Sequence, residues 1–109
     1  MAVVPFAGFE ASAGRDGEVV VRVRGEIDMA AAPVFRERLT AVIESNGDDV
    51  VVVDLADVSF MDSSGLVVLV EAHQKLESAS RKLLIARPSP AVTRVLEVTG
   101  LDRLFGEPG

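Results

Sequence analysis

An uninterrupted apolar run that leads through a polar junction into a helix constrains this chain most. Four valines, Val50 to Val53, follow one another near the middle of the sequence. Such a run is typical of a strand covered on both faces, in the middle of a sheet backed by helices. Asp54 is expected to end the buried run. Apolar residues return with helical spacing from Leu66 onward, which predicts a strand, a polar loop and a helix.

The polar junction has the composition of a helix start. The side-chain oxygens of Asp62, Ser63 and Ser64 can accept hydrogen bonds from the free amides of a first helical turn. Gly65 then leaves the backbone without a covering side chain. The apolar stripe of the predicted helix consists of Leu66, Leu69, Val70, His73 and Leu76.

Helical phase distinguishes the two serines, because residues three or four apart share a face. Ser63 lies three residues before Leu66, so we expect it near the buried side, where it would cap the helix. Ser64 has the same phase as Val68, Glu71 and Lys75, a mostly polar row. We therefore expect Ser64 to be the hydroxyl that a partner protein can reach, with Val68 as an exposed contact beside it.

The other elements follow from periodicity and turn residues. We expect an edge strand over residues 2–11, a strand with one buried face over 19–24, a helix from Pro33 to Asn46, a strand over 83–86, and a helix capped by Ser89 and ended by Gly100. This order predicts an α/β fold in a single domain over residues 1–109. Its small mixed β-sheet should have four to five strands, with the helices packed mainly on one face.

Composition excludes several classes of function. The 109 residues suffice for one domain with a core. With no cysteine and one histidine, we expect no disulfide, no thiolate catalysis, no metal site and no cofactor. A net charge of −6 argues against direct binding of nucleic acid. The apolar runs are shorter than the ~20 residues of a membrane span, so we expect a cytoplasmic protein that does not enter a membrane.

Three segments, in this order, resemble the STAS domain, and most closely the stand-alone bacterial anti-sigma factor antagonists. They are GEID at Gly25–Asp28, DLADVSFMDSSGL at Asp54–Leu66, and SPAVTRVLEVTGLDRLF at Ser89–Phe105. The resemblance covers the chain from about Val19 to Phe105.

The resemblance implies a partner switch in a protein that is not an enzyme. In that family the unphosphorylated protein binds an anti-sigma factor that is also a serine kinase, which frees the sigma factor. Phosphorylation of the second serine of the motif, which matches Ser64, ends the binding, and a metal-dependent serine phosphatase resets the switch. The partner contacts implied here are Asp28, Met61, Asp62, Ser63, Gly65 and Val68.

The same residues also allow other interpretations. A STAS subunit bound to a transporter's ATPase would use the same surface without phosphorylation. Asp28 and Asp57 could be turn and cap residues instead of partner contacts, and Asp-Ser-Ser-Gly is also an ordinary helix cap. Hydrolysis by Ser64 is disfavoured because the only histidine, His73, lies nine residues along the same helix, about 14 Å away.

A response-regulator receiver is the main rival from another class. Four aspartates fall at predicted strand ends, namely Asp28, Asp54, Asp57 and Asp62. A receiver, however, would have paired acids after its first strand and a lysine at the end of its last strand. The chain has neither, and His73 is expected to be a core residue.

Overall fold

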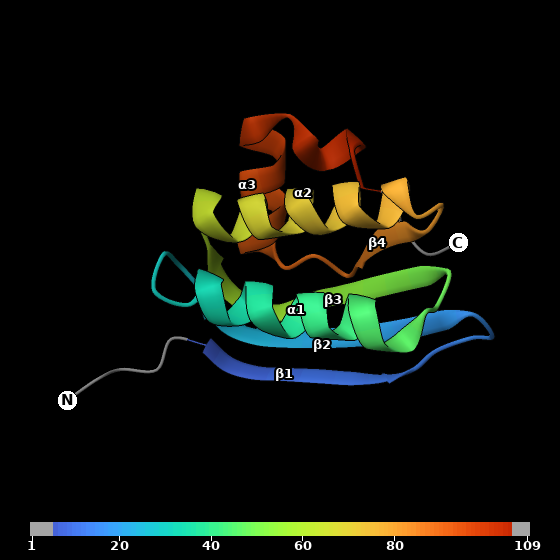
Figure 1. Ribbon diagram of the computed structural model, residues 1–109. Helices are drawn as coiled ribbons and strands as arrows, with labels where there is room; N and C mark the ends of the chain where they lie inside the picture. Colours follow the sequence, from blue (N-terminus) through green and yellow to red (C-terminus); the bar gives the residue numbers. More distant parts are fainter. Residues whose placement is uncertain (1–5, 106–109) are drawn as a thin grey trace.

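Two long strands form the centre of the structure, a computed structural model that describes residues 6–105. The elements in chain order are β1 (Phe6–Ala13), β2 (Glu18–Ile27), α1 (Ala32–Asn46), β3 (Val50–Met61), α2 (Ser63–Ser78), β4 (Lys82–Ala86), α3 (Pro90–Thr99) and the 3-10 turn η1 (Leu101–Arg103). The sheet order is β1-β2-β3-β4, with β1 antiparallel to β2 and the other neighbours parallel (Figure 1). The predicted mixed sheet is confirmed, with four strands among the described residues.

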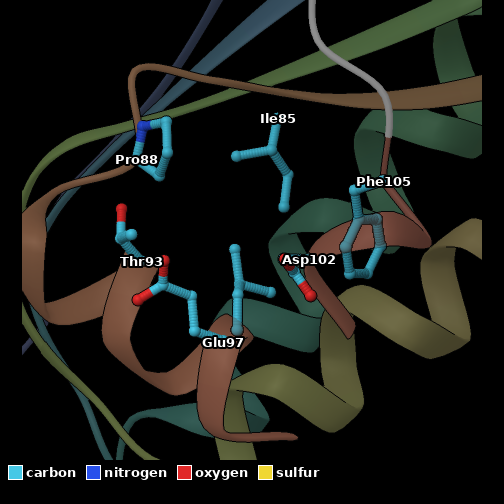
Figure 2. A pocket seen from close by; sticks show the side chains of 7 residues that line it. Ile85, Pro88, Thr93, Glu97, Asp102 and Phe105 are labelled. Carbon is cyan, nitrogen blue, oxygen red and sulfur yellow. The ribbon is translucent and has the colours of Figure 1, made fainter. Parts of the chain in front are cut away.

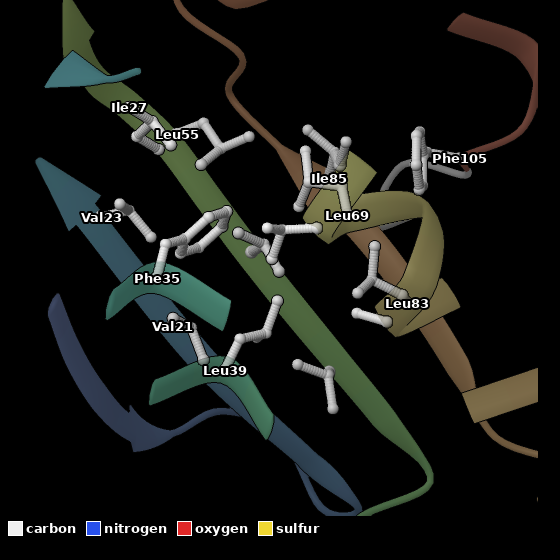
Figure 3. Close-up of a cluster of buried hydrophobic side chains, with 14 of the residues drawn as sticks. Val21, Val23, Ile27, Phe35, Leu39, Leu55, Leu69, Leu83, Ile85 and Phe105 are labelled. Atoms are coloured by element: carbon white, nitrogen blue, oxygen red, sulfur yellow. The ribbon is translucent and has the colours of Figure 1, made fainter. Parts of the chain in front are cut away.

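The helices lie on one face of this sheet, as predicted (Figure 1). On β2, Val19, Val21 and Val23 point to the helices and are buried, whereas Arg22 and Arg24 are exposed on the other face. This period of two is the one that the sequence predicts. Side chains from β2, β3, β4 and the helices meet in a single apolar core, which includes Phe35 and Leu39 of α1 (Figure 3).

Strand β3 is longer than predicted. It does not end at Asp54 but continues to Met61, and β4 pairs only with its first part, Val50–Asp54. The register between β2 and β3 shifts twice, between Arg22 and Arg24 and between Gly25 and Glu26. Such bulges let a strand continue past polar residues whose side chains would break a strict alternation. Asp54 is nevertheless buried, because Arg87 binds its carboxylate.

The helix ends agree with the sequence at three places. Gly47 ends α1 in the left-handed conformation, with φ of 64°, and Gly100 ends α3 in the same way, with φ of 75°. Ser89 caps α3, and its hydroxyl oxygen accepts a bond from the amide of Val92 at 3.3 Å. The start of the predicted edge strand, residues 2–5, lies outside the described residues.

Candidate functional site

The site lies at the carboxyl ends of β2 and β3. Ile27 and Met61, the last residues of the two strands, are partners in the parallel register. The amide of Asp62 continues this pairing, since it donates to the carbonyl of Ile27 at 3.4 Å. The turn that begins at Asp28 and the helix start at Asp62 therefore leave the sheet side by side. We call this region, formed by Asp28, Met29 and residues 62–64, the serine edge.

Asp62 caps helix α2, and the prediction that Ser63 is the cap is wrong. Asp62 has an extended backbone, and its Oδ1 accepts a bond from the amide of Ser64 at 2.8 Å. Ser63 is instead the first residue of the helix. A carboxylate satisfies a free amide as a hydroxyl does, and its charge also lies favourably at the positive end of the helix dipole.

The solvent exposure of the two serines is the reverse of the prediction. Ser63 is exposed, whereas Ser64 is half-buried. Val68, which has the phase of Ser64, is only 2% exposed, so the expectation of an exposed contact at Val68 is also wrong. The side chain that is exposed on this part of α2 is Val67, at 48%.

The reason is that the row of Ser64 faces helix α1. Glu71 accepts a bond from Arg36 at 2.8 Å, and Lys75 donates to Glu44 at 3.0 Å. Val68 lies about one turn before Glu71, where the two helices pack together. Because both ion pairs follow the same direction along the two helices, α1 and α2 run parallel, and Ser64 lies toward the first turn of α1. The polar residues of this row bridge two helices and do not mark a free surface.

Gly65 holds the start of α2 against the end of β2. A Cβ atom at this position would lie 2.7 Å from Cγ2 of Ile27, 3.1 Å from Cγ of Met61 and 3.2 Å from the carbonyl oxygen of Ile27. Both Gly65 and Met61 are buried. Their place in the structure is to support the serine edge from beneath, and a contact of either with a partner stays a prediction.

Asp28 organises the neighbouring turn. Its Oδ1 accepts bonds from the amides of Ala30 and Ala31, each at 3.0 Å. The alternative that Asp28 is a turn residue is therefore correct, and a partner contact through its remaining oxygen stays a prediction. The next residue, Met29, is 76% exposed. The sequence did not predict that Met29 is exposed, because only Asp28 in this turn carries a recognisable motif.

The aspartates at the strand ends do not form one acidic site. Asp54 is 6% exposed and accepts bonds from Arg87, at 2.5 Å from Nη2 and 3.2 Å from Nε. This hydrogen bond, together with the negative charge of Asp54, raises the pKa of Arg87 above its usual value. Within residues 6–105 no three His, Cys, Asp or Glu side chains are grouped so that they could hold a metal ion.

His73 lies on the inner side of α2, as predicted. Its side chain is 16% exposed, its ring meets Phe105 edge to face at 5.7 Å between centroids, and its Nε2 is 3.8 Å from Glu77. These contacts place it in the packing between α2 and the end of the described chain.

Among the described residues, no helix has the length and apolar character needed to cross a membrane.

Comparison with known proteins adds to this geometry. The model of the STAS domain matches residues 11–108. The chain belongs to the STAS domain family. The anti-sigma-B factor antagonist of Bacillus subtilis (strain 168) is 35% identical over 90 residues, which are 83% of this chain and 81% of that protein.

Solved structures of similar proteins share the fold. An anti-sigma factor antagonist from Mycobacterium paratuberculosis superposes with a TM-score of 0.81 at 33% identity, over 94% of this chain and 86% of its own. The antagonist SpoIIAA in its unphosphorylated form gives a TM-score of 0.76 at 25% identity, over 94% and 89%. Its phosphorylated form gives 0.70 at 24% identity, over 94% and 92%.

Proposed function

We propose that this protein is an anti-sigma factor antagonist that phosphorylation on Ser64 switches off. The unphosphorylated form binds an anti-sigma factor that is also a serine kinase, and a metal-dependent serine phosphatase restores it. The observation that carries the proposal is the Asp62-capped start of α2, with Ser64 in its first turn on the row that faces α1, in a STAS domain whose relatives are antagonists.

The charge of a phosphate explains how the switch would work. Phosphorylation adds about −1.5 to −2 charges. At the start of α2 the helix dipole favours this charge, so the fold is retained. The carboxylate of Asp62 already binds the amide of Ser64, so the phosphate adds to an existing negative charge. A partner that packs on this edge would then have to desolvate both anions, and each 1.4 kcal/mol of lost binding energy weakens its affinity about tenfold.

The position of Ser64 supports a binding surface to which both α1 and α2 contribute. Ser64 lies toward the start of α1, which follows the exposed Met29, and the exposed Val67 lies one turn further along α2. A partner could therefore contact apolar side chains from two elements with a hydroxyl between them. In the proposed complex, a phosphate on Ser64 would lie within the contact area and not at its rim.

The decisive experiment is phosphorylation by the cognate kinase. The chain is incubated with ATP, Mg²⁺ and the serine-kinase anti-sigma factor of its source organism, and the product is analysed by mass spectrometry after proteolysis. We expect one phosphate, on Ser64. The Ser64→Ala variant should remain unmodified, and the Ser63→Ala variant, which removes the more exposed neighbouring hydroxyl, should be modified as fully as the unaltered chain.

Two outcomes would contradict this assignment. A phosphate on Ser63 would transfer the acceptor role to the more exposed hydroxyl. Stable binding to a transporter's ATPase, with neither serine modified, would favour the alternative of a structural STAS subunit.

A further inference from the structure

A groove runs between the end of β3 and helix α3, next to the serine edge. It has a volume of about 490 Å³. Its walls are formed by Phe60, Met61, Pro90, Ala91, Arg94, Val95 and Val98. The first two of these residues directly precede the cap residue Asp62, so the groove and the serine edge are continuous along the chain.

Two large apolar side chains that line the groove are exposed to solvent. Helix α3 contributes Val92 and Leu96 to the core, at 0% and 6% exposure, but its flank toward the groove carries Val98, which is 81% exposed. Across the groove, Phe60 is 44% exposed, and it lies on the part of β3 beyond Asp54, where β4 no longer pairs with it. Neighbouring exposed apolar side chains that line one groove are typical of a surface that binds a partner.

One positive charge lies within this apolar surface. Of the described residues that line the groove, only Arg94 is charged, and it forms no ion pair with any residue in the range 6–105. The chain as a whole has a net charge of −6, whereas the charge that Arg94 brings to this groove is positive. An unpaired arginine beside apolar walls favours an apolar segment that carries a carboxylate.

The opposite flank of α3 has a different character. A smaller pocket of about 250 Å³ lies there, and Glu97 and Asp102 bring carboxylates to it beside Thr93 and Phe105 (Figure 2). None of the described residues that line this pocket is a cation. An acidic segment would be repelled by these carboxylates and attracted by Arg94, so charge selects the groove on the β3 side.

We propose that the groove binds an apolar segment of the anti-sigma factor that presents one acidic side chain to Arg94. This inference rests on the proposed function, and it adds a second contact that does not include Ser64. The flank from Pro90 to Val98 spans about 12 Å along the helix axis, which is enough for about two turns of a partner helix. Phosphorylation would then weaken binding at the serine edge and leave the groove contact intact.

Two substitutions in the groove test this proposal. Val98→Asp puts a carboxylate on the exposed apolar wall, and Arg94→Glu reverses the charge that would bind the partner's acid. Matched controls are Leu104→Asp, at a residue that is 38% exposed outside the groove, and Arg103→Glu on η1. Affinity for the kinase used in the phosphorylation experiment is measured by isothermal titration calorimetry, and circular dichroism checks that each variant is folded.

We expect each groove variant to bind at least tenfold more weakly than the unaltered chain, with both controls within twofold. Arg94→Lys should bind more tightly than Arg94→Glu. Groove variants that bind within twofold of the unaltered chain, while Ser64→Asp binds weakly, would overturn the groove proposal alone. If the groove variants bind weakly but Ser64→Asp binds normally, the groove is supported, and the switch at Ser64 is contradicted.

Discussion

Gly65 is the residue whose replacement tests the support of the serine edge most directly. Alanine at this position would bring its Cβ to 2.7 Å from Ile27 Cγ2, closer than Cβ atoms pack, and to a tight 3.2 Å from the carbonyl oxygen of Ile27. These close contacts are relieved only if α2 moves away from β2. We expect Gly65→Ala to lower the free energy of unfolding by about 1–3 kcal/mol, as is usual for overpacking.

Urea denaturation measures this change, with Ser63→Ala as the control. Ser63 is exposed, so its substitution should alter the free energy of unfolding by about 0.5 kcal/mol or less. The same displacement should also weaken partner binding by Gly65→Ala. A variant as stable as the unaltered chain would mean that the helix start is not held by this contact.

The two serines show what single-residue reasoning can and cannot decide. The sequence correctly identifies Asp62, Ser63 and Ser64 as the residues at a helix start. Helical phase predicts Ser63 as the cap, because Ser63 lies three residues before the buried Leu66. The actual cap is set by where β3 ends: since the strand continues to Met61, Asp62 is the first residue with a free side chain at the helix start.

At the scale of elements, a negative charge at the start of α2 should leave the helix stable but weaken partner binding. Ser64→Asp places a carboxylate in the first turn, where the helix dipole stabilises an anion by about 0.3–1 kcal/mol. We therefore expect Ser64→Asp to melt at or near the temperature of the unaltered chain, yet to bind the anti-sigma factor at least tenfold more weakly. Ser64→Ala should bind persistently in the presence of ATP.

Differential scanning calorimetry measures the melting temperature of each variant, and titration calorimetry measures its affinity for the anti-sigma factor. Equal affinities of Ser64→Asp and Ser64→Ala would contradict a switch based on charge. A large loss of stability in Ser64→Asp would mean that the variant acts by unfolding the helix and not by repelling the partner.

The pairing of α1 with α2 is the element-level feature that the sequence did not predict. Residues 64, 68, 71 and 75 form a row that looks polar and free, but Arg36 and Glu44 of α1 bind two of its members. A valine inside such a row is then buried between helices. Two exposed apolar side chains, Val67 and Phe60, are each one position away from the predicted contacts Val68 and Met61, which are buried.

For the whole molecule, we expect phosphorylation to change the structure only locally. The helices and the sheet share one apolar core, and Ser64 lies at its margin with its amide already bound to Asp62. Backbone amide spectra of the two forms should differ mainly within residues 57–70 and in the neighbouring turn at Asp28. Widespread shifts in β1, β4 and α3 would show instead that the switch works through a change in the fold.

The fold was largely predictable because its determinants are local. Alternation in β2, the valine run of β3, the stripes of α1 and α2, and the glycines that end α1 and α3 each specify an element without reference to the others. The length of β3 was not predictable, because bulges against β2 allow it to continue through Asp54 and Asp57. The groove beside α3 depends on the early end of β4, which only the sheet pairing reveals.

The sequence by itself thus determined the order of elements, the alternating faces of β2, and the location of the serine edge. The tertiary structure alone decided that Asp62 caps α2, that Ser63 is more exposed than Ser64, and that Val68 is buried against α1. The physical reason is that periodicity fixes the faces of a helix relative to its own axis. Whether a given face meets solvent or a second helix depends on the neighbours that the folded chain brings to it.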